Sequence, residues 1–199
     1  VVNHGPRSCV HGWNRAAEVA RGRILILNSD DMFAPPNWDA ELLAAIQNAQ
    51  KSIDSDFVLH VSTGSKRDGT LMTLPILSAA RYQRLGYALW PEYLSAYCDD
   101  EFTLHAVKDG VVINARHLLF RHENPYLGIG EMDEVYKREN REEAYTVGRE
   151  ILTRRQAAGF PPLPWRGGGS VTTASSAQRK RIAVCAPGSL FSARWVVNS

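Results

Sequence analysis

Short apolar runs alternate with amphipathic segments along the first half of the chain. The apolar runs 24–27 and 57–62 predict buried strands. Segments 13–20 and 37–49 predict helices, because the first carries its apolar residues on one face and the second opens with acidic residues that suit the start of a helix. Asn37 is a candidate N-cap for the second helix. This alternation predicts an α/β fold.

The same pattern continues to about residue 160. Residues 74–85 predict a helix that ends at Gly86, and 110–115 predict a short strand. Residues 132–158 are polar and rich in strong helix formers, so we expect a surface helix with a break near Gly148.

A change in composition follows residue 160 and predicts three regions. We expect an α/β domain over 1–160, a Pro/Gly/Ser-rich linker over 161–181, and the first strand and helix start of a second α/β module over 182–199. In an alternative arrangement, the terminal strand fills an open sheet position, either in its own chain or by exchange between two chains. A sheet with an unfilled edge also invites self-association.

Composition narrows the functional classes. The chain has 199 residues, 44% hydrophobic and 22% charged, which suits one globular domain with a core and a tail. A net charge of +2 does not favour nucleic acid as a partner. No apolar run is long enough to span a bilayer. The three cysteines are widely spaced, which favours neither a disulfide framework nor a zinc site, and we expect a cytoplasmic protein.

Two carboxylates directly follow the first predicted strand. The apolar run 24–27 ends in Asn28-Ser29-Asp30-Asp31, and ligands of open α/β sheets bind beyond the carboxyl ends of the strands. Carboxylate oxygens hold hard divalent cations, and such cations are natural partners of a diphosphate. The other interpretation is a strand-end turn closed by an aspartate side chain.

A second acidic cluster comprises Asp99, Asp100 and Glu101. Such a cluster stabilises the first turn of a helix. Neighbouring carboxylates also raise one another's pKa, which suits a general base. Both interpretations stay open on the sequence alone.

Several motifs occur in an order that resembles a known family. They are the segments 12–17, 20–22, 28–31, 86–87, 91–93, 99–102 and 110–113, followed by His122. Together they make residues 1–125 similar to the middle of a family-2 glycosyltransferase with a GT-A fold. The resemblance implies a Rossmann-like mixed sheet flanked by helices, incomplete at its N-terminal strand or strands, where the family's first strand and nucleotide-base pocket would lie.

The resemblance also implies an activity. The family transfers a sugar from a nucleoside-diphosphate sugar to a hydroxyl of a carbohydrate or another acceptor, so we expect a hexosyltransferase-like enzyme. Mn²⁺ or Mg²⁺ would neutralise the leaving diphosphate. One base acting in a single displacement would invert the configuration of the transferred sugar.

The motif positions assign roles to individual residues. The resemblance implies catalysis by Asp99, with Asp100 as the reserve candidate; donor binding by Asn14, Asn28, Asp30 and Asp31; metal binding by Asp30, Asp31 and His122; and acceptor contacts by Trp90 and Glu101. This chain departs from the family where Asn28 replaces the first carboxylate of the Asp-x-Asp motif, because an amide adds no negative charge.

Other interpretations remain for these residues and for the chain. Trp90 could instead pack in the core. His122 could be a loop histidine that is hydrogen-bonded to the backbone, and Asn14 could be a polar residue on a helix face. The chain could be a non-catalytic nucleotide- or sugar-binding remnant, or another metal-dependent phosphoryl-transfer enzyme. The sequence lacks the Gly-x-x-x-x-Gly-Lys loop of P-loop enzymes, which disfavours that class.

Overall fold

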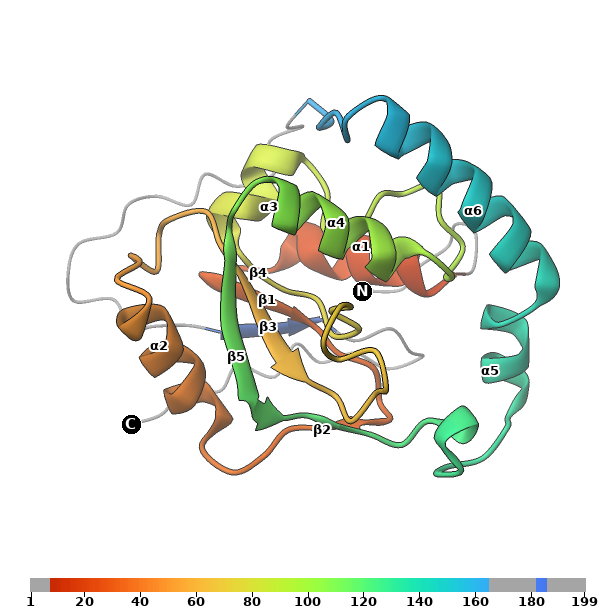
Figure 1. The fold of residues 1–199 in the computed structure, drawn as a ribbon, viewed down its shortest axis with the longest axis horizontal. Coiled ribbons are helices and arrows are strands. Elements are labelled where there is room, and N and C mark those ends of the chain that lie inside the picture. Colours follow the sequence, from red (N-terminus) through yellow and green to blue (C-terminus); the bar gives the residue numbers. More distant parts are fainter. Residues whose placement is uncertain (1–7, 165–181, 186–199) are drawn as a thin grey trace.

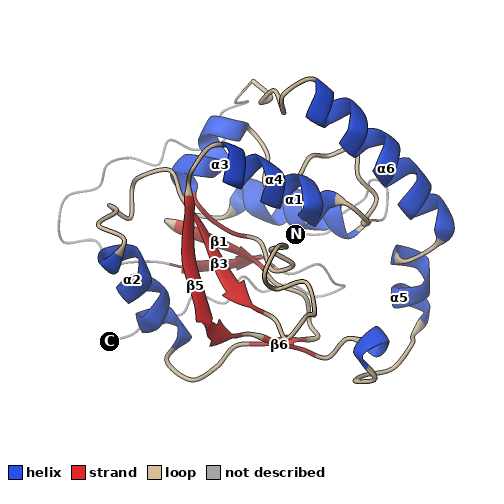
Figure 2. Cartoon of the chain, viewed as in Figure 1, coloured by secondary structure: helices blue, strands red, loops and turns tan. Residues whose placement is uncertain are grey.

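The computed structural model of the chain describes residues 8–164 and 182–185. They form a mixed sheet with helices on both faces, plus a small two-stranded ribbon (Figures 1 and 2). The elements, in chain order, are α1 (Cys9–Val19), β1 (Ile24–Leu27), β2 (Met32–Phe33), α2 (Trp38–Asn48), β3 (Val58–Ser62), β4 (Ile76–Ser78), α3 (Ala79–Leu85), α4 (Cys98–Lys108), β5 (Val112–Leu119), β6 (Arg121–His122), the 3-10 helix η1 (Pro125–Leu127), α5 (Glu134–Glu139), α6 (Glu142–Ala157) and β7 (Ile182–Cys185).

Strand direction decides where the loops of the sheet meet. The main sheet has the order β5-β3-β4-β1-β7. Strand β4 runs antiparallel to both β1 and β3, whereas β3 pairs parallel with β5 and β1 pairs parallel with β7. Strands β1, β3, β5 and β7 therefore point the same way, and their carboxyl ends lie at one edge of the sheet. The ribbon β2–β6 is antiparallel and follows β1 and β5 at that edge.

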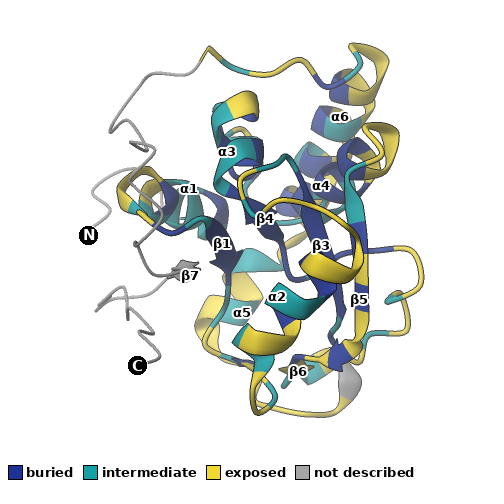
Figure 3. Cartoon of the chain, turned by 90° about the vertical axis from the view of Figure 1, so that its left-hand side faces the viewer, coloured by how far each residue is buried: buried dark blue, intermediate teal, exposed yellow. Residues whose placement is uncertain are grey.

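The sheet is buried on both faces because its strands alternate between two apolar clusters. Leu25 and Leu27 of β1 pack with residues of α1, α3, α4 and α6, whereas Ile24 and Ile26 pack with residues of α2. Continuous apolar strands are typical of a sheet covered on both faces. Figure 3 shows the central strands in dark blue and the outer turns of α2 and α6 in yellow.

The predicted strands 24–27 and 57–62 are confirmed as β1 and β3, and the helix expected at 37–49 is confirmed as α2. The helix predicted over 74–85 is wrong in its first part, because 76–78 form strand β4 between β1 and β3. Helix α3 starts only at Ala79, where the Ser78 hydroxyl accepts a hydrogen bond from the Arg81 amide. It ends as predicted at Gly86, in the left-handed conformation.

The expected helix over 132–158 is divided, but not at Gly148. Its break falls at 140–141, between α5 and α6, where the Asn140 side chain donates to the Tyr136 carbonyl oxygen at 2.8 Å and closes α5. Gly148 lies inside α6 and is buried. A Cβ atom at this position would come within 2.4 Å of the Ala96 carbonyl oxygen. The glycine therefore lets α6 approach the segment before α4.

Strand β7 occupies the edge of the sheet beside β1. The two strands pair in parallel from Ile24 opposite Ile182 to Leu27 opposite Cys185. This is the arrangement that the alternative prediction described for a single chain, whereas the main prediction placed 182–199 in a second module. Of the predicted linker, only 161–164 are described, and 186–199 also lie outside the described residues.

Among the helices of the described part, none combines the length and the apolar character that crossing a membrane requires.

Gly148→Ala should destabilise the protein by about 1–3 kcal/mol, because the added methyl group overpacks the contact with Ala96. The change would oppose the gain of about 1 kcal/mol that alanine gives a helix interior. Gly69→Ala is the matched control, since a Cβ at Gly69 meets nothing within 4 Å. Urea unfolding of both variants measures the effect, and a stabilised Gly148→Ala protein would contradict the packing argument.

Candidate functional site

The loop after β1 and the ribbon strand β6 meet at the carboxyl edge of the sheet. The ribbon pairs Met32 with His122, which brings the His122 Nε2 atom to 3.0 Å from the Asp31 Oδ2 atom. Burial raises the pKa of Asp31, but hydrogen bonds from His122 and Ser29 outweigh it, so the net pKa lies below the ordinary value. Asp31 is therefore an ionised carboxylate held against an imidazole.

Asp30 is the more accessible of the two adjacent carboxylates. Its side chain is exposed and, within the described residues, makes no hydrogen bond or ion pair. The structure thus brings together two of the three predicted metal ligands, Asp31 and His122. In the described part of the chain, no group of three or more His, Cys, Asp or Glu residues is arranged to hold a metal ion.

The loop after β3 is fixed by one carboxylate. Asp68 accepts hydrogen bonds from the Ser62 hydroxyl at 2.6 Å, the Thr63 amide at 3.0 Å, the Thr63 hydroxyl at 2.9 Å and the Gly64 amide at 2.8 Å. Burial raises the pKa of Asp68, but these hydrogen bonds bring it below the ordinary value. The His122 amide donates to the Thr63 carbonyl oxygen at 3.3 Å, so this loop contacts the ribbon.

The first turn of α4 carries the second acidic cluster to the same loop. The Arg67 Nη2 atom lies 2.7 Å from the Asp100 Oδ1 atom. Burial and, after it, the neighbouring Asp100 charge raise the pKa of Asp99 to about 6. The carboxyl edge therefore presents one carboxylate paired with a guanidinium and, beside it, a carboxyl group whose pKa is raised to about 6.

These contacts connect two acidic corners of the carboxyl edge. One corner is Asp30 and Asp31 after β1, and the other is Asp99 and Asp100 at the start of α4. The Asp31 carboxylate contacts His122, the His122 amide donates to Thr63, the Thr63 amide donates to Asp68, and the neighbouring Arg67 pairs with Asp100. The two corners come from sequence segments about 70 residues apart, yet the shared strand direction places them at one edge. This arrangement is the candidate active site.

A tyrosine cluster, consisting of Tyr126, Tyr136 and Tyr145, lies beside this edge. The rings of Tyr126 and Tyr136 are 5.4 Å apart, and the Tyr136 hydroxyl donates to the Asn124 side-chain oxygen at 2.7 Å. Tyr126 is 64% and Tyr145 39% exposed. Burial raises the pKa of Tyr136 to about 12, and Asp31 adds to this rise. Burial also raises the pKa of Tyr145, and Asp99 adds to that rise.

No pattern in the sequence predicts a role for Arg67 or for the tyrosine cluster. Arg67 lies in a polar loop whose fold depends on hydrogen bonds to Asp68, which no periodicity reveals. The three tyrosines come from η1, α5 and α6 and converge only in the tertiary structure. The only available signal was the presence of large aromatic residues in a polar stretch.

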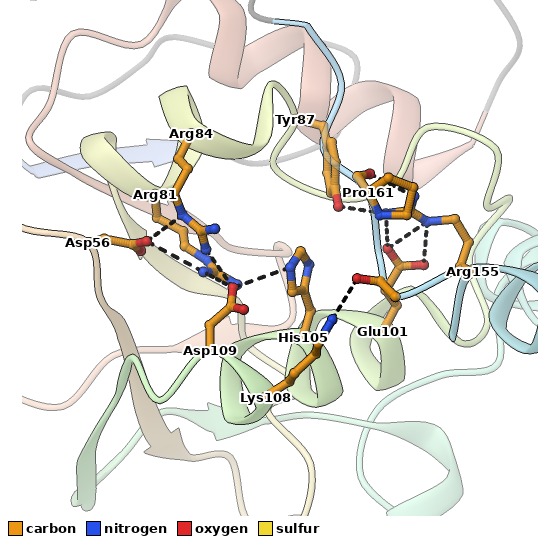
Figure 4. A network of polar contacts seen from close by, with 11 residues as sticks. Asp56, Arg81, Arg84, Tyr87, Glu101, His105, Lys108, Asp109, Arg155 and Pro161 are labelled. Atoms are coloured by element: carbon orange, nitrogen blue, oxygen red, sulfur yellow. Dashed lines mark hydrogen bonds and ion pairs between the residues drawn. The ribbon is translucent and has the colours of Figure 1, made fainter. Parts of the chain in front are cut away.

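The acceptor-side assignments of Glu101 and Trp90 need correction. The Glu101 side chain is 3% exposed and lies 2.8 Å from the Arg155 Nη2 atom (Figure 4). It also accepts a hydrogen bond from the Tyr93 hydroxyl at 3.0 Å. The Trp90 ring lies under the same guanidinium, 3.5 Å from its carbon to the ring centroid, and packs against the core. Glu101 therefore pairs across the α4–α6 interface and Trp90 stacks on the same arginine, so both side chains have structural partners.

The two asparagines assigned to donor binding also have structural partners. Asn14 donates to the Leu89 carbonyl oxygen at 2.6 Å and accepts from the Ala88 amide at 2.9 Å, which ties α1 to the chain after α3. Asn28 donates to the carbonyl oxygens of Ser29 at 2.6 Å and Met32 at 3.2 Å, which closes the turn after β1. The Asn14 side chain is therefore occupied, whereas the Asn28 side-chain oxygen has no hydrogen bond within the described residues.

No protein-family model, no curated protein and no solved structure matches the chain. The chemistry of the site is therefore argued from its geometry alone. Two features define that geometry. One is the Asp31–His122 contact after β1, with Asp30 exposed beside it. The other is the Asp99–Asp100 pair at the start of α4, which Arg67 joins to the loop after β3.

Asp99→Asn should stabilise the protein increasingly as the pH rises. The folded-state pKa of Asp99, about 6, lies above the unfolded value of about 3.9, so ionisation of Asp99 between these values costs folding free energy. Between pH 4 and pH 7, the free energy of unfolding of the variant should rise by up to about 3 kcal/mol relative to that of the native protein. Urea unfolding across this range measures it, and a difference independent of pH would contradict the assignment.

Asp68→Asn is the control with the opposite sign. The folded-state pKa of Asp68 is lowered, so its stabilisation is present above the unfolded pKa and is lost as the pH falls. We expect this variant to be least stable relative to the native protein at neutral pH and to approach it in acid.

Proposed function

We propose that this chain is a glycosyltransferase of the GT-A type, which transfers a hexosyl group from a nucleoside-diphosphate sugar to an acceptor hydroxyl. The observation that carries the proposal is that both acidic corners lie at the carboxyl edge of a mixed α/β sheet. The reaction needs both corners, one for the diphosphate that leaves and one for the hydroxyl that attacks. The mixed sheet with helices on both faces is compatible with this fold type.

The corner after β1 suits the donor. Mg²⁺ in nucleotide sites is held by one or two carboxylates and by the substrate's own phosphates. Asp30 and Asp31 are therefore enough protein ligands for such an ion, and no third one is required. His122, already 3.0 Å from Asp31, could join them. Mn²⁺ or Mg²⁺ bound there would neutralise the leaving diphosphate. The Asn28 side-chain oxygen can accept a hydrogen bond from a donor hydroxyl.

The corner at α4 suits the general base. A base works best when its pKa lies near the operating pH, and the Asp99 pKa of about 6 meets this condition. Asp100 is already paired with Arg67, which favours Asp99 over its neighbour for this role. One such base, taking the proton from the acceptor hydroxyl as it attacks the sugar, gives a single displacement with inversion.

The tyrosine cluster suits the acceptor. Exposed aromatic rings with fixed orientation offer flat apolar faces and hydroxyl groups, which together match a sugar ring. The side chains Tyr136 and Tyr145 interact electrostatically with Asp31 and Asp99, one in each corner. This placement favours a carbohydrate acceptor over other compounds that carry a hydroxyl group.

One observation favours a second candidate, a nucleotide-binding protein without transfer activity. Asp100 is neutralised by Arg67, so part of the negative charge at this edge is already paired within the protein. Turnover separates the two functions, because a binding protein would not release the nucleoside diphosphate from the sugar.

UDP or GDP should stabilise the native protein only when Mn²⁺ is present, and Asp30→Ala should abolish this effect. Ligand at 100 times its Kd stabilises the folded state by about 2.7 kcal/mol, a shift that thermal unfolding detects readily. Asp54→Ala, in the loop before β3, is the control at the opposite edge of the sheet. Equal stabilisation of Asp30→Ala and native protein would exclude Asp30 from the donor corner.

Asp99→Asn should lower kcat for sugar transfer by about 10²–10⁴-fold, the usual contribution of a general base, with little change in donor affinity. Release of nucleoside diphosphate from a panel of nucleotide sugars, with carbohydrate acceptors, measures kcat. Donor affinity is measured separately by titration. A parallel loss of affinity and turnover would contradict a role as base.

A further inference from the structure

Arg67 lies in the loop after β3, which contacts the ribbon through Thr63 and the first turn of α4 through the Arg67–Asp100 pair. One of its terminal nitrogens, Nη2, contacts Asp100 at 2.7 Å, and its side chain is 58% exposed. Its remaining N–H donors make no hydrogen bond within the described residues, although arginine carries five of them in a planar fork. Most of its hydrogen-bonding capacity is therefore available to a ligand.

The charge of this edge requires a cation when an anionic ligand arrives. Asp30, Asp31, Asp99 and Asp100 all lie there, and each repels a diphosphate when ionised. Among the described residues, the basic groups paired with these carboxylates are His122 and Arg67. A guanidinium binds phosphate oxygens through two parallel hydrogen bonds, which an imidazole cannot do.

The backbone of the loop keeps Arg67 in place while its side chain stays accessible. The Arg67 carbonyl oxygen accepts from the Thr70 amide at 2.8 Å and the Leu71 amide at 2.9 Å, and Asp68 fixes the preceding turn. The ion pair with Asp100 is largely solvent-exposed on the arginine side, and such pairs are weak. The side chain can therefore change its partner without a change in the loop.

We propose that Arg67 binds the diphosphate of the donor by exchanging its ionic partner, leaving the Asp100 carboxylate for the phosphate oxygens. This inference rests on the proposed function. Donor binding then removes the guanidinium from the neighbourhood of Asp99 and exposes that group to the full charge of Asp100. The base corner is thus strengthened only after the donor is in place.

Calorimetric titration with inorganic pyrophosphate and Mg²⁺ tests the exchange without depending on a nucleoside pocket. We expect Arg67→Gln to weaken binding about tenfold or more, the loss of one charge-assisted bidentate contact. Asp100→Asn should tighten binding by up to about fivefold, because Arg67 no longer has to leave a partner. The Asp100→Asn change should tighten binding clearly less in the Arg67→Gln background than in the native protein, because only the relief of charge repulsion remains.

The double variant separates partner exchange from a general change in charge. If Asp100→Asn tightens binding equally with and without Arg67, the effect is only the removal of a negative charge and the proposal is overturned. Unchanged affinity in Arg67→Gln, or no binding of pyrophosphate by the native protein at millimolar concentration, also overturns it. Lys66→Gln controls for the charge of the loop, and Arg67→Lys should restore only part of the affinity.

Transfer assays keep this inference distinct from the proposed function. Pyrophosphate binding that follows the expected pattern, with no release of nucleoside diphosphate from any nucleotide sugar, supports the role of Arg67 and refutes glycosyl transfer. Sugar transfer by Arg67→Gln with an unchanged KM for the donor refutes the role of Arg67 and leaves glycosyl transfer standing.

Discussion

The buried ion pair between Glu101 and Arg155 is the interaction on which the arrangement of the site depends. Its side chains are 3% and 4% exposed, and the guanidinium also reaches the Tyr87 hydroxyl and the Pro161 carbonyl oxygen. Removing one partner of such a pair costs about 3–5 kcal/mol, because the other charge stays buried alone. The pair fixes α6 against α4 one residue after Asp100, and so fixes the position of the base corner.

The rest of the site is built from weaker contacts at the carboxyl edge of the sheet. The ribbon β2–β6 positions His122 against Asp31, and Asp68 orders the loop that carries Arg67. A rigid framework thus supports side chains that remain half-buried or exposed. Functional residues are commonly placed in this way, on loops held by a fixed scaffold.

Local signals were sufficient wherever a single element determined its own structure. The apolar run 24–27 and the glycine at position 86 predicted β1 and the end of α3. The run 74–85 was different, because a short apolar segment fits a buried strand as well as a helix. Only the available pairing partners, β1 and β3, turned 76–78 into a strand. The same limit applies to Glu101, which reads as part of an acidic cluster but pairs with a residue 54 positions away.

The sequence by itself determined the α/β class, the principal strands and the two acidic clusters, because these depend on hydrophobic periodicity and on residue type. The tertiary structure decided which carboxylates could act, since burial and partners distinguish Asp99 from Glu101 within one helical turn. It also decided that β7 joins the main sheet and that Arg67 pairs with Asp100. Contacts between distant segments carry no local signal, so strand pairing and ionic partners emerge only when the chain is folded.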